Sequence, residues 1–132
     1  MDTDTKIRYL KLSLATFGGI FLLIYPLGVV WPAGWVWHGG DGYYYLHMII
    51  GVYAVLGIYL IRAAANPLEN LSLIWFTVWS SVAHAVVMGF YGIKDGNETG
   101  HLIGDVPALF VVAIVFGYLA SGLEPSRKTA AA

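Results

Sequence analysis

The stretch from Asn66 to Tyr91, NPLENLSLIWFTVWSSVAHAVVMGFY, predicts a membrane-spanning helix. Crossing the hydrocarbon core of a bilayer takes about 20 mostly apolar residues, and this stretch is longer than that. Asn66 is a typical N-cap, Pro67 suits the first helical position, and Glu69 suits the first turn. We therefore expect a helix over residues 67–91.

The composition of the whole chain also indicates an integral membrane protein. Hydrophobic residues make up 58% of the 132 residues and charged residues only 11%, whereas a soluble domain has about 25% charged residues. This length predicts a single transmembrane domain, residues 1–132. The net charge of -1, without a basic stripe, predicts no nucleic-acid partner. The chain has no cysteine, which excludes thiolate metal sites and thiol nucleophiles.

Three further apolar segments are long enough to cross a bilayer. The first covers about residues 12–30 and should bend near Pro26, because the proline ring removes a backbone donor. The second covers about residues 43–61. The last covers about residues 102–123. With the helix over residues 67–91, these segments predict an all-α fold, a four-helix transmembrane bundle.

The start of the last helix has two interpretations. Asp105 either caps it, since Asp-x-Pro is a common helix entry, or the helix begins near His101. The segment before it, residues 92–101, is rich in glycine and predicts a loop. Asp95 and Glu98 in this loop are interpreted as a solvated turn, because their spacing does not match a calcium-binding loop.

The distribution of Lys and Arg predicts how the bundle is oriented. Positively charged segments favour the cytoplasm. All Lys and Arg residues except Lys94 fall on one side of the predicted topology: Lys6, Arg8, Lys11, Arg62, Arg127 and Lys128. Both termini are therefore expected in the cytoplasm, with residues 31–42 and 93–100 outside. The expected location is the cell (inner) membrane, as a multi-pass protein with the lipid bilayer as its partner.

His84 is the most informative polar residue of the outer half. It lies about two turns below the outer end of its helix, roughly 10 Å deep. Charge is costly at that depth, so we expect the side chain to face the bundle interior. Thr77 and Ser81 recur on the same helix at helical spacing. Together with His84 they either join helices by hydrogen bonds or form part of a ligand site.

A second pair of candidates stands where the last helix begins. His101 and Asp105 are four residues apart, so on one continuous helix they share a face, and the carboxylate could orient the imidazole. The alternative is that Asp105 only caps the helix while His101 lies in the loop. His38, in a glycine-rich loop, is interpreted as solvated.

Convergence of the outer polar residues would create a metal or haem site. Imidazoles with one carboxylate, from His47, His84, His101 and Asp105, suit a transition metal such as zinc, copper or iron. A haem held by two axial histidines, His47 and His84, is the second interpretation. His47 also has a simpler interpretation, as an interfacial side chain turned outward.

Two rows of small residues indicate close helix packing. Such rows let helix backbones approach each other in membranes. They pack helices either within one protomer or between protomers, which would give a homo-oligomer or a larger membrane complex. The rows are Ser81, Ala85 and Gly89 on one helix and Ala113, Gly117 and Ser121 on another.

Four stretches resemble an uncharacterised family of small bacterial four-helix integral membrane proteins. They are YLKLSLATFG, WPAGWVWH, SLIWFTVWSSVAHAVVM and GHLIGDVPAL. The resemblance covers about residues 9–119 and implies fold and location but no activity. It places His84, His101, Asp105 and Pro107 within the family's motifs and matches neither His38 nor His47 to one.

The leading functional hypothesis is a non-catalytic accessory or binding protein with a polar His/Asp pocket at the extracytoplasmic end of the bundle. The alternative is a metal- or haem-dependent membrane redox protein that uses the same residues. A carrier for a small solute is the third interpretation, and the scarcity of polar residues in the cytoplasmic half argues against it.

Overall fold

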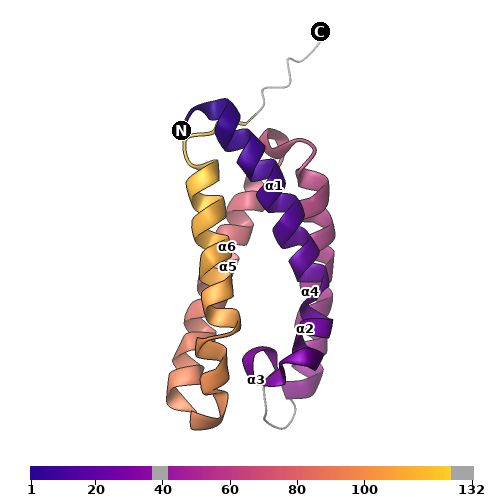
Figure 1. Cartoon of the computed structure of the whole chain (residues 1–132), viewed down its shortest axis with the longest axis vertical. Coiled ribbons are helices and arrows are strands. Elements are labelled where there is room, and N and C mark those ends of the chain that lie inside the picture. Colours follow the sequence, from indigo (N-terminus) through magenta and orange to yellow (C-terminus); the bar gives the residue numbers. More distant parts are fainter. Residues whose placement is uncertain (37–41, 126–132) are drawn as a thin grey trace.

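A computed structural model describes residues 1–36 and 42–125, and within these ranges the chain is all-α without a strand. Trp37, His38 and Asp41 lie outside the described residues, so the prediction of a solvated His38 falls there too. The elements in chain order are α1 (Thr3–Leu22), α2 (Ile24–Val30), α3 (Pro32–Trp35), α4 (Gly42–Ala63), the 3-10 turn η1 (Pro67–Glu69), α5 (Leu71–Lys94), the 3-10 helix η2 (Gly96–Leu102) and α6 (Asp105–Ala120) (Figure 1).

Three segments of the described chain are long and apolar enough to cross a membrane: Tyr44–Ala63, Leu71–Lys94 and Gly96–Ala120. α1 and α2 pass the same test only as a pair, bent by 56°. By length and composition, three helices of the described chain could therefore cross a membrane, or four if the bent pair counts as one span. Long apolar helices are what a bilayer demands, because their backbone polar groups are bonded internally.

The helices form two tight pairs that meet at one end of the molecule. α1 packs against α4, and α5 packs against α6, while α1 and α6 connect the pairs. α4 and α5 contact each other little, although they follow one another in the chain. The beginning of α1 and the end of α6 lie at the same end, and α3 and η2 lie at the other (Figure 1).

Two glycines set the distance between α1 and α4. A Cβ atom added to Gly18 would stand 2.7 Å from the carbonyl oxygen of Gly57, and one added to Gly57 would stand 2.6 Å from that of Gly18. Real Cβ contacts are longer, so the two backbones can touch only because both positions lack a side chain.

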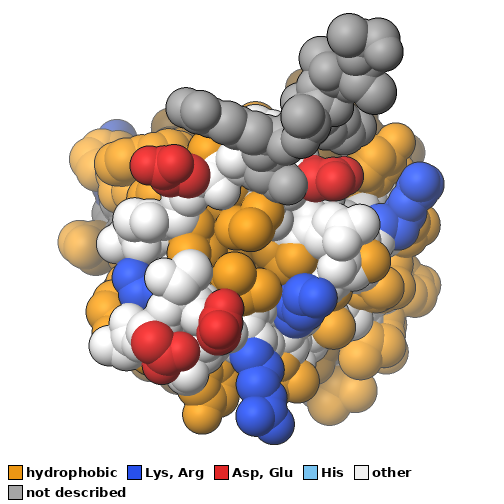
Figure 2. All heavy atoms as spheres, turned by 90° about the horizontal axis from the view of Figure 1, so that it is seen from above, with side chains coloured by type: hydrophobic (Ala, Val, Ile, Leu, Met, Phe, Trp, Pro, Cys, Tyr) orange, Lys and Arg blue, Asp and Glu red, His pale blue; other side chains and the backbone are white. Residues whose placement is uncertain are grey.

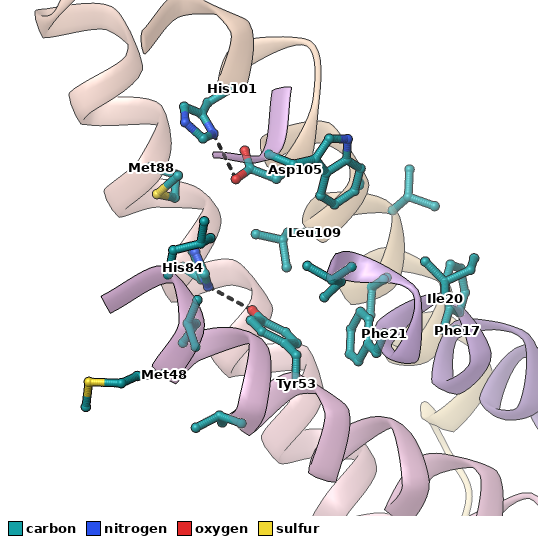
Figure 3. A pocket seen from close by; sticks show the side chains of 18 of the residues that line it. Phe17, Ile20, Phe21, Met48, Tyr53, His84, Met88, His101, Asp105 and Leu109 are labelled. Atoms are coloured by element: carbon teal, nitrogen blue, oxygen red, sulfur yellow. Dashed lines mark hydrogen bonds and ion pairs between the residues drawn. The ribbon is translucent and has the colours of Figure 1, made fainter. Parts of the chain in front are cut away.

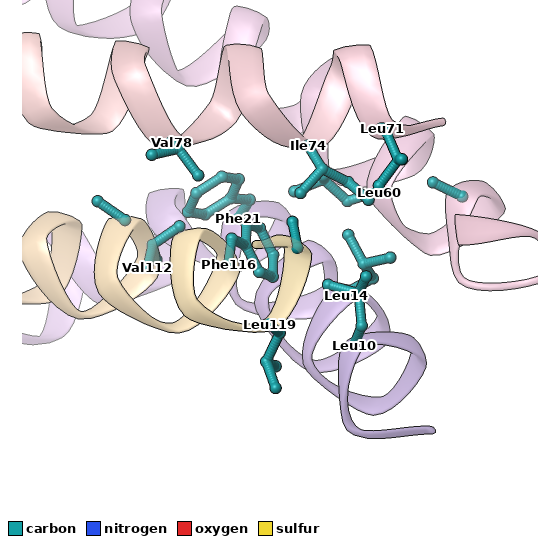
Figure 4. Packing of buried hydrophobic residues seen from close by; sticks show 13 residues of the cluster. Leu10, Leu14, Phe21, Leu60, Leu71, Ile74, Val78, Val112, Phe116 and Leu119 are labelled. Atoms are coloured by element: carbon teal, nitrogen blue, oxygen red, sulfur yellow. The ribbon is translucent and has the colours of Figure 1, made fainter. Parts of the chain in front are cut away.

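The apolar core lies in the half that carries the termini (Figure 4). Leu10, Leu14, Leu60, Ile74 and Phe116 are fully buried there, one or more from each of α1, α4, α5 and α6. Dispersion contacts in such a close-packed cluster join the two pairs, which the sparse α4–α5 contact alone would not do.

Charged side chains gather on the end face that carries the termini, while the flanks of the molecule are hydrophobic (Figure 2). Lys6 extends from α1 to the end of α6, where its Nζ donates to the backbone carbonyl of Ser121 over 2.8 Å. This bond closes the polar end of the α1–α6 contact.

The first apolar segment ends at Val30 as predicted, but it begins earlier, and its bend lies slightly ahead of Pro26. The helix begins at Thr3, not near residue 12, because Asp2 caps it by accepting a hydrogen bond from the Thr5 backbone N–H over 3.1 Å. The break falls at Leu23, three residues before Pro26. Pro26 has no N–H to donate to the carbonyl four residues earlier, so the helix breaks one turn ahead of the proline.

The predicted start of the third helix is also wrong. Residues 67–69 form the separate turn η1, in which the Asn70 N–H bonds the Pro67 carbonyl over 3.0 Å. The Asn70 side chain then donates to the Asn66 carbonyl over 2.9 Å, and α5 starts only at Leu71. Asn66, the predicted cap, makes no capping bond through its side chain.

The region predicted as a loop, residues 92–101, is helical over most of its length. α5 continues to Lys94, and η2 follows, begun by Asp95, whose Oδ1 accepts a hydrogen bond from the Asn97 N–H over 3.0 Å. Of the two interpretations of the last helix, the start at Asp105 is the one observed, and the helix ends at Ala120 rather than 123.

Candidate functional site

A cavity of about 830 Å³ lies between the two helix pairs. Its walls are mostly apolar side chains of α1, α2, α4 and α6. Its polar lining includes Tyr53, His84, His101 and Asp105, which converge from α4, α5, η2 and α6 (Figure 3). The volume falls within the range of about 300–1,000 Å³ in which proteins bind small molecules.

His101 lies between two carboxylates. Its Nδ1 is 2.9 Å from Oδ2 of Asp105, and its Nε2 is 3.2 Å from Oε2 of Glu98. His101 is 1% exposed, Glu98 2% and Asp105 13%. The Nδ1 contact with Asp105 is a hydrogen bond, whereas the Nε2 contact with Glu98 is a contact within ion-pair distance, so two acidic side chains hold the ring from opposite sides.

Asp105 acts on His101 rather than on the helix backbone. It is the first residue of α6, and the N-cap position belongs to Gly104. The interpretation of Asp105 as nothing more than a helix cap is therefore wrong. The second carboxylate oxygen, Oδ1, is buried and has no hydrogen-bond partner among the described residues, although a carboxylate has acceptor sites on both oxygens.

His84 enters the same cavity from α5. Its Nδ1 lies 2.8 Å from the hydroxyl of Tyr53 on α4. The Tyr53 ring in turn meets the Phe21 ring edge to face, with centroids 4.9 Å apart. His84 is thus held by a partner that is itself packed against α1.

The structure does not bring all candidates of the sequence to this cavity. Thr77 and Ser81 are buried, but neither lines the cavity, and the Thr77 hydroxyl donates to the Leu73 carbonyl of its own helix over 2.9 Å. His47 is exposed, with its ring 6.2 Å from that of Tyr25. His47 and His84 therefore share no cavity that could hold a haem between them.

A metal centre finds no support in the side-chain arrangement. Within residues 1–36 and 42–125, no group of three or more His, Asp or Glu side chains could hold a metal ion. His84 pairs with Tyr53, and His101 pairs with carboxylates of its own segment. His84, His101 and Asp105 therefore line the same cavity. Their side chains do not converge on one point, whereas coordination of a metal ion requires such convergence.

Sequence reasoning missed two residues of the site. Glu98, predicted to be solvated, is one of the most buried side chains, so that prediction is wrong. Its spacing to His101 and Asp105, i, i+3 and i+7, is a helical periodicity that could have indicated it. Tyr53 had no such signal, because a single hydroxyl in an apolar helix does not reveal its partner.

At the end of the cavity where α3 and η2 lie, two backbones are in close contact. α3 packs against η2. A Cβ atom added to Gly100 or Gly104 would collide with the carbonyl groups of Ala33 and Gly34, respectively. Glycine at these two positions is what lets the α3 turn rest on the segment that carries His101.

The rows of small residues pack helices within the protomer. A Cβ atom on Gly89 would stand 3.8 Å from Val106, and one on Gly117 would stand 3.8 Å from Val78. Both contacts join α5 to α6. These rows position the start of α6, and with it Asp105, beside α5.

Comparison with known proteins places the chain in a family. No curated protein and no solved structure matches it significantly. A family model described as a family of unknown function matches nearly the whole chain, which agrees with the resemblance to an uncharacterised family. The chain therefore belongs to the family of unknown function DUF6632, whose model covers residues 4–131.

Proposed function

We propose that this protein is a small integral membrane binding protein that holds a hydrophobic small molecule in the cavity between its helix pairs. The cavity itself carries the proposal, because its apolar walls end in a few convergent polar groups. This combination is typical of small-molecule sites, where apolar surface supplies affinity and a few polar groups fix orientation. The absence of a metal-binding arrangement among the described residues leaves the redox alternative without a supporting observation.

We place the protein in a bacterial inner membrane as a four-span bundle, with both termini in the cytoplasm and the His101 end outside. The Lys and Arg asymmetry supports this orientation. The bent pair α1–α2 then counts as the first span. Because the chain has no native cysteine, single cysteines at Asn97 and Glu69 can report the two faces. Asn97 should react with an impermeant maleimide in intact spheroplasts, and Glu69 only after permeabilisation.

Occupancy of the cavity can be tested by filling it. Ala108 lines the cavity, so Ala108→Phe places a ring where a ligand would lie. Ala83, exposed on α5 outside the cavity, is the control position for the same substitution. Native mass spectrometry of the detergent-solubilised protein with undecanol should show a one-to-one complex for the unmodified chain and for Ala83→Phe. Ala108→Phe should lose it. Equal retention by all three proteins would contradict binding in this cavity.

A further inference from the structure

The cavity has an opening on the flank of the molecule. Met48 and Val52 on α4 and Val111 on α6 line the cavity and are also exposed, by 65%, 62% and 49%. These residues belong to the segments long enough to span a membrane. In a bilayer the opening therefore faces lipid, so that a molecule dissolved in the membrane reaches the cavity without crossing a polar surface.

The route from the outer aqueous side is obstructed by backbone. The contacts of Gly100 with the Ala33 carbonyl and of Gly104 with the Gly34 carbonyl hold α3 against η2. Trp35, at the end of α3, also lines the cavity. A ligand that arrived from water would have to separate these two segments, whereas one that arrived from lipid would not.

A buried carboxylate oxygen of the cavity wall indicates which head group such a molecule carries. Oδ1 of Asp105 is buried without a hydrogen-bond partner among the described residues. A buried acceptor that forms no hydrogen bond costs free energy. A small rotation of the carboxylate about its terminal torsion, which is soft, turns Oδ1 toward the cavity while Oδ2 stays near His101. A donor at this wall would then complete the hydrogen bonding of Asp105.

We infer that the ligand is a lipid-soluble alcohol that enters between α4 and α6 and donates its hydroxyl to Asp105, with its apolar body toward Phe21; this rests on the proposed function. A hydroxyl fits better than an ammonium for two reasons. One oxygen of Asp105 already forms a hydrogen bond with His101 over 2.9 Å, so the carboxyl group is not a free counter-charge for an ammonium. A neutral head also costs less than a charged one to bring inside a membrane.

The test compares undecanol with its methyl ether, which has the same chain but no donor. Binding is titrated calorimetrically with the full chain in detergent micelles, and the ratio of the two affinities is compared between proteins, so that partitioning into the micelle cancels. Undecanol should bind the unmodified protein about tenfold or more tighter than the ether, the usual worth of a hydrogen bond to a charged acceptor. Asp105→Asn, whose amide N–H₂ replaces the free acceptor, should bring the ratio close to one.

Asp95→Asn is the matched control, because Asp95 is exposed at the same end and does not line the cavity. It should keep the ratio of the unmodified protein. An unchanged ratio in Asp105→Asn, or tighter binding of undecylamine than of undecanol to the unmodified protein, would overturn the assignment of the head while the binding function stands. Failure of both undecanol and its ether to bind the unmodified protein would overturn the proposed function itself.

A second measurement needs no substitution and remains informative if Asp105→Asn fails to fold. An alkanol with a diazirine beside its hydroxyl is photolysed with the unmodified protein, and the labelled peptides are identified by mass spectrometry. The label should fall on residues 101–109 or on Trp35, beside Asp105. Labelling confined to Phe17 and Phe21, at the apolar end, would show the opposite orientation and overturn the inference.

Discussion

The hydroxyl of Tyr53 and Nδ1 of His84 lie 2.8 Å apart and join α4 to α5, two helices that otherwise contact each other little (Figure 3). Both residues line the cavity. This hydrogen bond therefore connects the two helix pairs beside the cavity, where their backbones lie apart. The packed core at this level is small: Ala85, Val106 and Leu109 form a minor buried cluster against which Tyr53 packs. The hydrogen bond therefore adds to a limited apolar contact between the two helix pairs.

Tyr53→Phe should remove this hydrogen bond. The substitution removes only the hydroxyl, so we expect a loss of about 1 kcal/mol in unfolding free energy, the usual worth of an interhelical hydrogen bond in a membrane protein. Tyr59→Phe is the control on the same helix, since Tyr59 is exposed and its contact with Arg62 involves the ring rather than the hydroxyl. Unfolding by sodium dodecyl sulfate measures the change in unfolding free energy for both variants. In a double-mutant cycle with His84→Leu, additive effects would show that the pair is not coupled.

Glu98→Ala should destabilise the protein more than any removal of an exposed carboxylate. Glu98 is fully buried beside His101, and removing one partner of a buried charged pair costs about 3 kcal/mol or more. Glu69→Ala, at an exposed acidic position of the opposite end, should change the unfolding free energy by less than about 0.5 kcal/mol. The same detergent titration checks this, and equal effects of the two substitutions would mean that the burial of Glu98 is not energetically important.

Gly104→Ala should separate α3 from η2. The added methyl group would collide with the Gly34 carbonyl, and overpacking of this kind costs about 1–3 kcal/mol. Hydrogen exchange followed by mass spectrometry should show faster exchange in residues 32–36. Gly96→Ala is the control, because nothing lies within 4 Å of a Cβ atom at that position. Unchanged protection of residues 32–36 in Gly104→Ala would contradict the closure of the cavity by α3.

Gly18→Ala should loosen the α1–α4 pair. The new Cβ atom would stand 2.7 Å from the Gly57 carbonyl oxygen, so the helices have to move apart, at about 1–3 kcal/mol of unfolding free energy. Gly51→Ala, also on a helix of this pair but with open space around its Cβ position, should be neutral or slightly stabilising because alanine favours helix. Detergent unfolding measures both variants, and equal unfolding free energies would show that α1 and α4 are not in close contact.

Much of the fold could be predicted from the sequence because a lipid bilayer restricts a spanning segment to very few backbone structures. Long apolar runs in a bilayer have to bond their backbone internally, so their length and composition alone indicate spanning helices. The pairing of His101 with Asp105 was also accessible from their i, i+4 spacing, although His101 lies in η2 and Asp105 at the start of α6 rather than on one continuous helix. The errors concern boundaries such as Leu23 and Asn70, where a missing N–H or a side-chain bond to the backbone outweighs the apolar pattern.

The composition of the site was decided by tertiary structure. Whether His84 meets a metal, a haem or Tyr53 depends on how far α4 stands from α5, and the core at the other end of the bundle sets that distance. Glu98 lies in η2, and this segment packs against both α5 and α3, with close backbone approaches at Gly92 and Gly100. Local sequence predicts which side chains share a helix face, but contacts between helices depend on packing over the whole bundle, and no short stretch contains that information.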